Sequence, residues 1–393
     1  MLLRLTKFLN KAALKGMFYQ LLSVLGICRI GRFVHRRQAL ILTYHGVARN
    51  GRNLYTNRNC VEMAMFDRQM AYMARHYNVV PLSELVGRFN AGKQLPPYTA
   101  AITFDDGFRN NLAVALPILQ KYHLPATIFL ATSFISSDEL GLWTECIDSL
   151  IHRTSVQNIR LTLDGVKKSF PLRSAADREI ASDQVRAFLK TLAATQRKFA
   201  LKELEEQLEE KTDRPQSGGD NGSEPSEIHE QSTAEKEERY AFLSWQQVQM
   251  MARGSITFGS HTHTHAILAP LSEPDLNFEL TESRRLIEQN LGASCTLFSY
   301  PNGAKRDFGR REEELLGSLG YVAAVSQIDG FNDASTNIMA LRRINIPRDD
   351  SLSFFIAKVS GVWSVLKRLQ NLGARCGVVS YKRDRASAEN RTV

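Results

Sequence analysis

The chain has 393 residues, which fits one large domain with extensions, or two domains, and excludes a single small domain. Hydrophobic residues make up 43% of the chain, enough for a sizeable core, and the net charge at pH 7 is +9. The five cysteines are scattered without the spacing of a zinc clip or a redox motif, which favours reduced and mostly buried thiols.

The positive charge is concentrated at the N-terminus. The first 61 residues hold no Asp or Glu, whereas the rest of the chain has 39 basic residues against 41 acidic ones. This asymmetry predicts an acidic partner, either a membrane surface or nucleic acid, although no nucleic-acid motif is present. The basic residues of this segment are Arg4, Lys7, Lys11, Lys15, Arg29, Arg32, Arg36, Arg37, Arg49, Arg52 and Arg58.

Residues 1–37 are predicted to form a basic amphipathic segment. The lysines and arginine from Arg4 to Lys15 fall on one helical stripe, and leucines from Leu2 to Leu25 fall on another, which is typical of a helix lying in a membrane interface. The alternative is an amphipathic helix packed on the protein's own body. The apolar run Met17–Cys28 has twelve residues, too few for a span of about 20, and no signal-peptide cleavage site follows it. We expect a cytoplasmic protein bound peripherally to the inner face of the membrane.

From residue 39 onward, predicted strands alternate with predicted helices, which indicates a parallel sheet or barrel with helices outside it. In such folds the chemistry lies at the C-terminal ends of the strands. The predicted strands are 39–47, 79–82, 99–107, 126–131, 256–260, 296–300, 321–325 and 341–346, and the predicted helices are 66–76, 83–91, 110–123, 245–252, 274–291 and 311–319.

The alternation lapses between residues 134 and 240, which we interpret as an insertion in the barrel. It contains two predicted helices, 141–152 and 182–210, and a stretch at about 211–238 whose polar composition predicts disorder. The expected organisation is an N-terminal segment 1–37, a catalytic domain 38–360 and a basic C-terminal tail 361–393.

Polar clusters fall at the ends of four predicted strands. They are His45, the pair Asp105–Asp106 followed by Gly107, the run His261–His265, and Tyr300–Pro301. A carboxylate and two histidines four residues apart can hold one metal ion and leave positions open for water and substrate. Zinc is the default expectation, non-haem iron uses the same ligand set, and adventitious metal binding is the trivial alternative.

These motifs resemble those of the polysaccharide deacetylase (NodB-homology) family. Thr103–Gly107 looks like the family's first signature, His261–His265 resembles its metal motif, and Phe298–Gly303 resembles the aromatic-Pro-x-Gly strand that follows. Gly320–Ala324 and Leu341–Ile344 also fit. The resemblance covers roughly residues 40–359 and implies a distorted (β/α) barrel of the NodB type.

The resemblance also implies roles for individual residues. Asp106, His261 and His265 would hold a divalent ion, with zinc as the expected metal, and Asp105 would be the general base. No histidine follows His265, so the general acid is assigned to His45, as in permuted members whose N-terminal strand supplies it. A backbone N–H near Tyr300 would help hold the oxyanion. Substrate contacts are further predicted for Tyr300, Pro301, Trp143 and Arg343, and Arg343 is also a candidate for orienting the base.

The sequence therefore predicts a metal-dependent hydrolase that removes N-acetyl groups from amino sugars of a surface polysaccharide or lipid-linked glycan. The same residues would serve an O-acetyl esterase or an N-deformylase. A catalytically silent glycan-binding module is a further alternative, against which the intact set of acidic and histidine residues argues.

Overall fold

The computed structural model describes residues 11–49, 59–137, 142–163, 166–189, 192, 194–209, 241–348 and 351–375. The stretch predicted to be disordered lies outside these residues. The chain divides into two compact units, residues 37–350 and residues 1–36 with 351–393, and each is described by itself.

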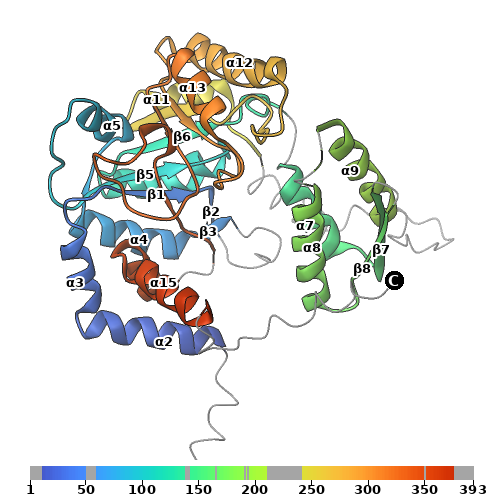
Figure 1. The fold of residues 1–393 in the computed structure, drawn as a ribbon, viewed down its shortest axis with the longest axis horizontal. Coiled ribbons are helices and arrows are strands. Elements are labelled where there is room, and N and C mark those ends of the chain that lie inside the picture. The colour runs from blue at the N-terminus through green and yellow to red at the C-terminus, as the bar shows by residue number, and fades with distance from the viewer. Residues whose placement is uncertain are drawn as a thin grey trace, which may run out of the picture. The chain divides into compact units, whose positions relative to one another are not determined.

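The larger unit is built on a curled parallel sheet (Figure 1). Its strand order is β11-β10-β9-β6-β5-β1-β12, and β4 pairs with β5. The central strands are buried on both faces, which is why they read as continuous apolar runs. This architecture confirms the predicted distorted barrel. The strands are β1 Leu40–Tyr44, β4 Asn78–Val79, β5 Thr99–Phe104, β6 Ala126–Leu130, β9 Ile256–Ser260, β10 Leu297–Ser299, β11 Ala323–Val325 and β12 Ile344–Asn345.

Helices lie around the outside of this sheet (Figure 1). Local sequence signals define several of their ends: Ser244 and Gln247 form a capping box at the start of α11, and Gly292 ends α12 at φ 64°. The helices are α4 Met63–His76, α5 Leu82–Asn90, α6 Leu116–Lys121, α11 Trp245–Ala252, α12 Glu273–Leu291, α13 Arg310–Ser318 and the short 3₁₀ helix η3 Ile338–Ala340.

Two short features modify this plan beside the ends of β1 and β5. After His45 the chain continues as β2 Gly46–Ala48, which pairs in parallel with β3 Cys60–Glu62. The predicted helix 110–123 begins as a π-helical turn, η2 Asn111–Ala115, before α6. Such turns are frequent at functional sites, and this one lets Asn111 donate a hydrogen bond to the backbone oxygen of His45 at 2.8 Å.

The insertion has a hydrophobic core of its own, which includes Ile147, Ile159 and Leu204. Its antiparallel hairpin of β7 Asn158–Leu163 and β8 Val166–Pro171 was not predicted, although the Asp-Gly pair between the two strands is a hairpin signal. The predicted helix 182–210 is two helices, α8 Ala175–Leu189 and α9 Ala194–Glu209, which follow α7 Trp143–Arg153.

The smaller unit consists of helices from both ends of the chain: α2 Lys11–Val24, α3 Ile27–Val34, α14 Leu352–Val359 and α15 Val362–Arg375. Its core is formed by Tyr19, Cys28, Phe354, Ala357 and Val362. Within the described part of the chain, no single helix is long and apolar enough to cross a membrane. One bent pair, Gly16–Val24 with Ile27–Val34 at 73°, passes that test of length and composition together.

Candidate active site

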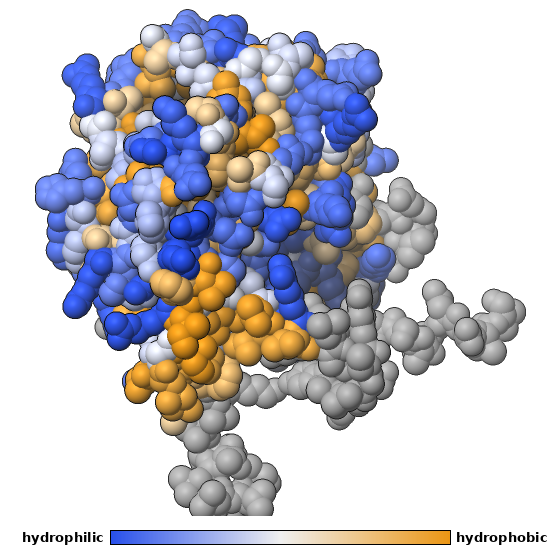
Figure 2. Space-filling model, turned by 60° about the vertical axis from the view of Figure 1, so that its left-hand side comes forward, coloured by the Kyte–Doolittle hydropathy of each residue, from blue (hydrophilic) through white to orange (hydrophobic). Residues whose placement is uncertain are grey.

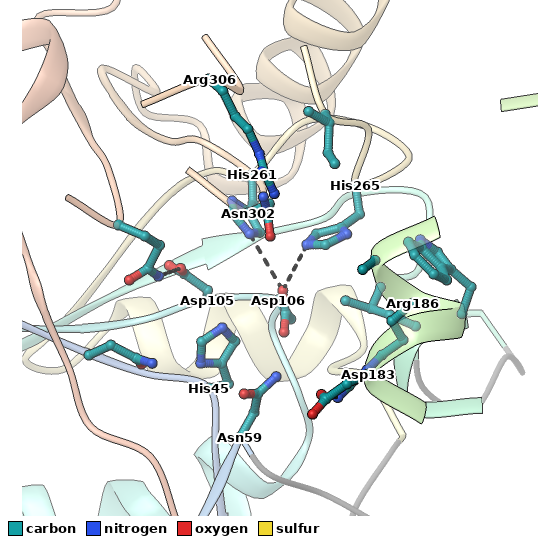
Figure 3. A pocket seen from close by; sticks show the side chains of 16 residues that line it. His45, Asn59, Asp105, Asp106, Asp183, Arg186, His261, His265, Asn302 and Arg306 are labelled. Carbon is teal, nitrogen blue, oxygen red and sulfur yellow. Dashed lines mark hydrogen bonds and ion pairs between the residues drawn. The ribbon is translucent and has the colours of Figure 1, made fainter. Parts of the chain in front are cut away.

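The C-terminal ends of β1, β5 and β9 open into one pocket of about 480 Å³ (Figure 3). His45 follows β1, the pair Asp105–Asp106 follows β5, and His261 follows β9, with His265 four residues further along. Because β1 pairs with β5 in parallel, and β6 links β5 to β9 in the same way, these ends lie at one edge of the sheet. The structure thus brings together His45, Asp105, Asp106, His261 and His265, from three of the four clusters that the sequence placed at strand ends.

The backbone at this edge adopts conformations that are unfavourable for most residues. Asp106 has φ 76° and His265 has φ 57°, both in the left-handed region, and Gly107 follows with φ 82°. A Cβ atom at Gly107 would lie 2.8 Å from the Cδ2 atom of Leu130. The Asp-Asp-Gly turn therefore requires glycine both for its φ angle and for the close approach of β6.

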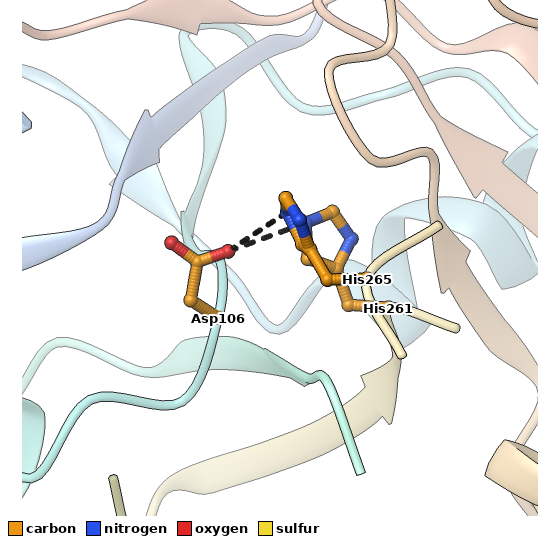
Figure 4. A group of neighbouring side chains, drawn as sticks. All are labelled: Asp106, His261 and His265. Carbon is orange, nitrogen blue, oxygen red and sulfur yellow. Dashed lines mark ion pairs between the residues drawn. The ribbon is translucent and has the colours of Figure 1, made fainter. Parts of the chain in front are cut away.

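The side chains of Asp106, His261 and His265 point toward one another (Figure 4). The Nε2 atoms of both histidines approach the same oxygen, Oδ1 of Asp106. The distance is 3.5 Å for His261 and 3.4 Å for His265. These separations match those between ligands of one tetrahedral ion at about 2.0–2.1 Å. Asp106 Oδ1 is buried and has no hydrogen-bond partner among the described residues, which also fits a metal ligand.

The orientation of His261 supports the same interpretation. Its Nδ1 lies 2.7 Å from the backbone oxygen of Ser299. Donation of the Nδ1 proton to that oxygen leaves the lone pair of Nε2 facing Asp106, an arrangement typical of metal-ligating histidines. Burial raises the pKa of Asp106, but the close approach of His261 and His265 lowers it more strongly, so this carboxylate is held in its ionised form.

The loop that carries the histidines is held by Glu279 of α12, which is 6% exposed. Its carboxylate accepts hydrogen bonds from the backbone N–H groups of His263 and Thr264, at 2.8 Å each, and from the hydroxyl of Thr264. This buried acid is absent from the sequence prediction, since a glutamate in the middle of an amphipathic helix gives no signal of such a contact.

Asp105 forms a buried two-pronged ion pair with Arg343, with N–O distances of 2.8 and 2.7 Å. The Ser299 hydroxyl and the Gln327 side-chain amide donate further hydrogen bonds to the carboxylate at 3.2 and 3.3 Å. Burial raises the pKa of Asp105. The guanidinium of Arg343 and the nearby His261 have the opposite and larger combined effect, so the pKa of Asp105 lies below its usual value. The side chain of Arg343 is 0% exposed, so it holds Asp105 from behind and does not line the pocket.

The other predicted contacts divide into two groups. Trp143 of α7 lines the pocket, whereas Tyr300 and Pro301 are not among the lining residues. The ring of Tyr300 stacks on Phe308 at 3.9 Å and its hydroxyl donates to the backbone of Met339. The backbone N–H of Tyr300 is bonded to the oxygen of Val325 at 3.1 Å, so that group is already used within the sheet.

Several lining residues were not predicted. Asn302 lies within the Phe298–Gly303 motif that the sequence analysis names. No sequence motif marks the other four, which are Asn59, Arg306, Gln327 and Asn345. The insertion contributes Asp183 and Arg186 from α8 (Figure 3). Arg186 is paired with the buried Asp148 and with Asp183, at 2.8 Å each, so one wall of the pocket is a fixed charged cluster.

The pocket has the composition of a hydrolase site: an ionised carboxylate with a fixed partner, a group of three residues that could hold a metal ion, and an imidazole. A profile of the polysaccharide deacetylase family matches residues 92–162 and 180–324. These ranges are more than half of the chain, which therefore belongs to the polysaccharide deacetylase family and is a deacetylase, as the sequence predicted. No curated protein matches the chain.

Solved structures agree on the fold. The Streptococcus pyogenes deacetylase PplD, in complex with acetate, is 17% identical with a TM-score of 0.51, over 82% of this chain and 98% of that one. IcaB from Ammonifex degensii is 15% identical, also with a TM-score of 0.51, over 82% of this chain and 97% of that one. At these identities the similarity supports the architecture alone.

Proposed function

We propose that the protein is a divalent-metal-dependent N-deacetylase acting on amino sugars of a glycan. The observation that carries this proposal is the meeting of the Asp106–His261–His265 group, the Asp105–Arg343 pair and His45 in a single pocket. The family gives the class of reaction; the choice of N-acetyl groups, the metal and the residue roles are inferred from this arrangement.

Asp106, His261 and His265 would hold the ion, and zinc suits one carboxylate with two imidazoles. A bound divalent ion lowers the pKa of water from 15.7 to about 7 and polarises a carbonyl oxygen. All three of these residues line the pocket, so an ion that they held would be accessible to a substrate bound there.

Asp105 is proposed to accept the proton from the attacking water. Its pKa is held below the usual range, mainly through Arg343 against the effect of burial, so it is ionised at neutral pH and ready to act as a base. The bidentate pairing also fixes the direction of the carboxylate, because both oxygens are tied to Arg343 nitrogens.

His45 is proposed to donate a proton to the departing nitrogen. When the carbon–nitrogen bond of the amide breaks, the amine needs this proton, and the products are acetate and the free amino sugar. Figure 3 shows His45 and the two metal-binding histidines on different sides of Asp106, as expected for an acid and a metal group that act on opposite parts of one amide. The hydrogen bond from Asn111 fixes the backbone of His45 in this position.

The proposal is tested by measuring acetate and formate release from N-acetyl, O-acetyl and N-formyl forms of matched glucosamine oligomers. We expect metal-dependent acetate release from the N-acetyl form and its loss in Asp105→Asn, with metal content retained. Faster turnover of the O-acetyl or N-formyl form would replace the proposed reaction with esterase or deformylase activity. Absence of turnover of all three, with metal bound, would favour a silent binding module.

A lipid-linked amino sugar is the proposed alternative to a polymer as the substrate, together with a location on the inner face of the membrane. Its support is the basic N-terminal sequence, which holds no acidic residue before Glu62. Comparing acetate release from a soluble oligomer and from a lipid-linked N-acetylhexosamine distinguishes the two substrates.

A further inference from the structure

Helices α2 and α3 present large apolar side chains to solvent instead of burying them. Met17, Leu21 and Val24 on α2 are 58%, 55% and 78% exposed, and Ile30 and Phe33 on α3 are 65% and 55% exposed. With Phe18, Leu25, Ile27 and Val34 they form what we call the corner surface (Figure 2). Isolated exposed apolar residues are ordinary, but a contiguous patch indicates an interaction site.

The corner surface is not the face on which these helices fold. Tyr19 is 4% and Cys28 2% exposed, and both pack in the core of the smaller unit with Phe354 of α14. The ring of Tyr19 lies 4.6 Å from that of Phe354. The helices therefore have one face that stabilises the unit and a second apolar face that remains exposed.

The charge of the smaller unit indicates what kind of partner fits the corner surface. Helices α2, α3, α14 and α15 contain eight Lys or Arg residues and no Asp or Glu. Arg29 on α3 and Arg368 on α15, a helix that packs against α3, are both exposed. The guanidinium of Arg36 lies 3.9 Å from the centre of the Phe33 ring, beside the apolar residues. An exposed apolar face with basic residues and no acidic ones is complementary to the apolar interior and anionic headgroups of a membrane.

The geometry limits how deeply the surface can enter. The two helices meet at 73° near Gly26, which has φ 78° and starts α3. Their outer faces thus form a corner with apolar residues on both arms, and neither arm alone is long enough to cross a bilayer.

We propose that the corner surface of α2 and α3 inserts into the interface of an anionic membrane, with positive charge on the same helical unit attracting the headgroups. The sequence alone indicated a basic stripe on residues 1–37; the structure identifies the inserting residues and adds the C-terminal helices as part of the docking unit. This proposal is independent of the catalytic one, since it concerns a different unit of the chain.

The test is flotation of the full chain with vesicles of phosphatidylcholine, with and without phosphatidylglycerol, at low and high salt. We expect binding that needs phosphatidylglycerol and weakens with salt. In the variant Leu21→Ser/Ile30→Ser/Phe33→Ser, binding should fall by at least about tenfold, because three side chains no longer enter the apolar layer. The matched control is Ile180→Ser/Phe199→Ser/Met250→Ser, whose residues are 55%, 77% and 53% exposed on the larger unit; it should bind like wild type.

Circular dichroism and thermal unfolding establish that both variants are folded. Neither these controls nor the vesicle-binding assay depends on enzyme activity. Equal loss of vesicle binding in the two variants would overturn the proposal, since any exposed apolar residue would then serve. A second result would also overturn the proposal: the wild-type chain binds no vesicles but self-associates in analytical ultracentrifugation, whereas the triple variant is monomeric. That result would assign the corner surface to a second copy of the chain.

Discussion

Replacing Arg343 by Met tests whether Asp105 depends on its buried partner. The two side chains are 0% and 2% exposed, and Arg343 also donates to the hydroxyls of Thr103 and Ser299 at 3.2 and 2.9 Å. Removing one partner of such a pair leaves an uncompensated buried charge, which lowers the free energy of unfolding by about 3–5 kcal/mol. We expect Arg343→Met to reach this range at pH 7, and to lose most deacetylation because the base is no longer oriented.

The effect should depend on pH in a direction set by Asp105. In wild type its pKa is lowered, so its contribution to stability is complete above the unfolded value of about 3.9 and is lost as the pH falls below that value. Without Arg343, burial raises the pKa of Asp105, so protonation relieves the strain of the buried charge. The difference in stability between wild type and Arg343→Met should therefore shrink between pH 7 and pH 4.

Guanidinium denaturation at several pH values measures this difference, and the double variant Asp105→Asn/Arg343→Met supplies the comparison. The double variant should be more stable than the sum of the two single changes predicts, by about 1–3 kcal/mol, because the two residues form one unit. Additive effects, or a difference that does not change with pH, would refute the reasoning that Arg343 acts through the charge of Asp105.

Three further predictions concern the surroundings of the pocket. His265→Ala should bind zinc at least about tenfold more weakly than wild type, measured by competition with a chromophoric chelator. Glu279→Ala should lower metal affinity about 10–100-fold, because the loop at Thr264 loses its anchor, while Glu279→Gln should retain part of it; equal affinity in all three proteins would exclude this role. Gly259→Ala should reduce the free energy of unfolding by about 1–3 kcal/mol in denaturant titration, because its Cβ would lie 2.7 Å from the Phe129 ring; an unchanged midpoint would contradict the close packing.

The sequence predicted the sheet well because its central strands are short buried apolar runs bounded by polar turns. The prediction that chemistry lies at the strand ends followed directly, since the pairs of strands are parallel and their ends share one edge. For this reason the sequence alone places Asp105, Asp106 and His261 close together.

Other features depend on contacts that no local pattern reveals. Arg343 contacts Asp105 although the two residues are 238 positions apart in the sequence, and its motif alone does not show which carboxylate it would pair with. Tyr300 was expected near the substrate, yet the direction of its ring is decided by packing on Phe308. The insertion gave only a weak signal, because its hairpin and helices bury a small core of their own, and its contact with the pocket through Arg186 arises from tertiary packing.

The prediction of a C-terminal tail after residue 360 illustrates the same limit. Val362–Arg375 forms α15, which belongs with α2, α3 and α14 in one unit. Helices from opposite ends of a chain carry no sequence pattern that reveals their pairing. Cys28, Cys60 and Cys295, by contrast, are buried, as the scattered cysteine pattern indicated.

The most direct test of the central claim is acetate release from N-acetylglucosamine oligomers by wild type, His45→Ala and the control His76→Ala, with the bound metal measured in each protein. The account predicts that chelation abolishes wild-type release and that zinc restores it. His45→Ala should keep its metal but lose most activity, while His76→Ala, a change on α4 outside the pocket, should behave like wild type. Full activity in His45→Ala, or acetate release that persists without metal, would contradict the proposed division of roles among the pocket residues.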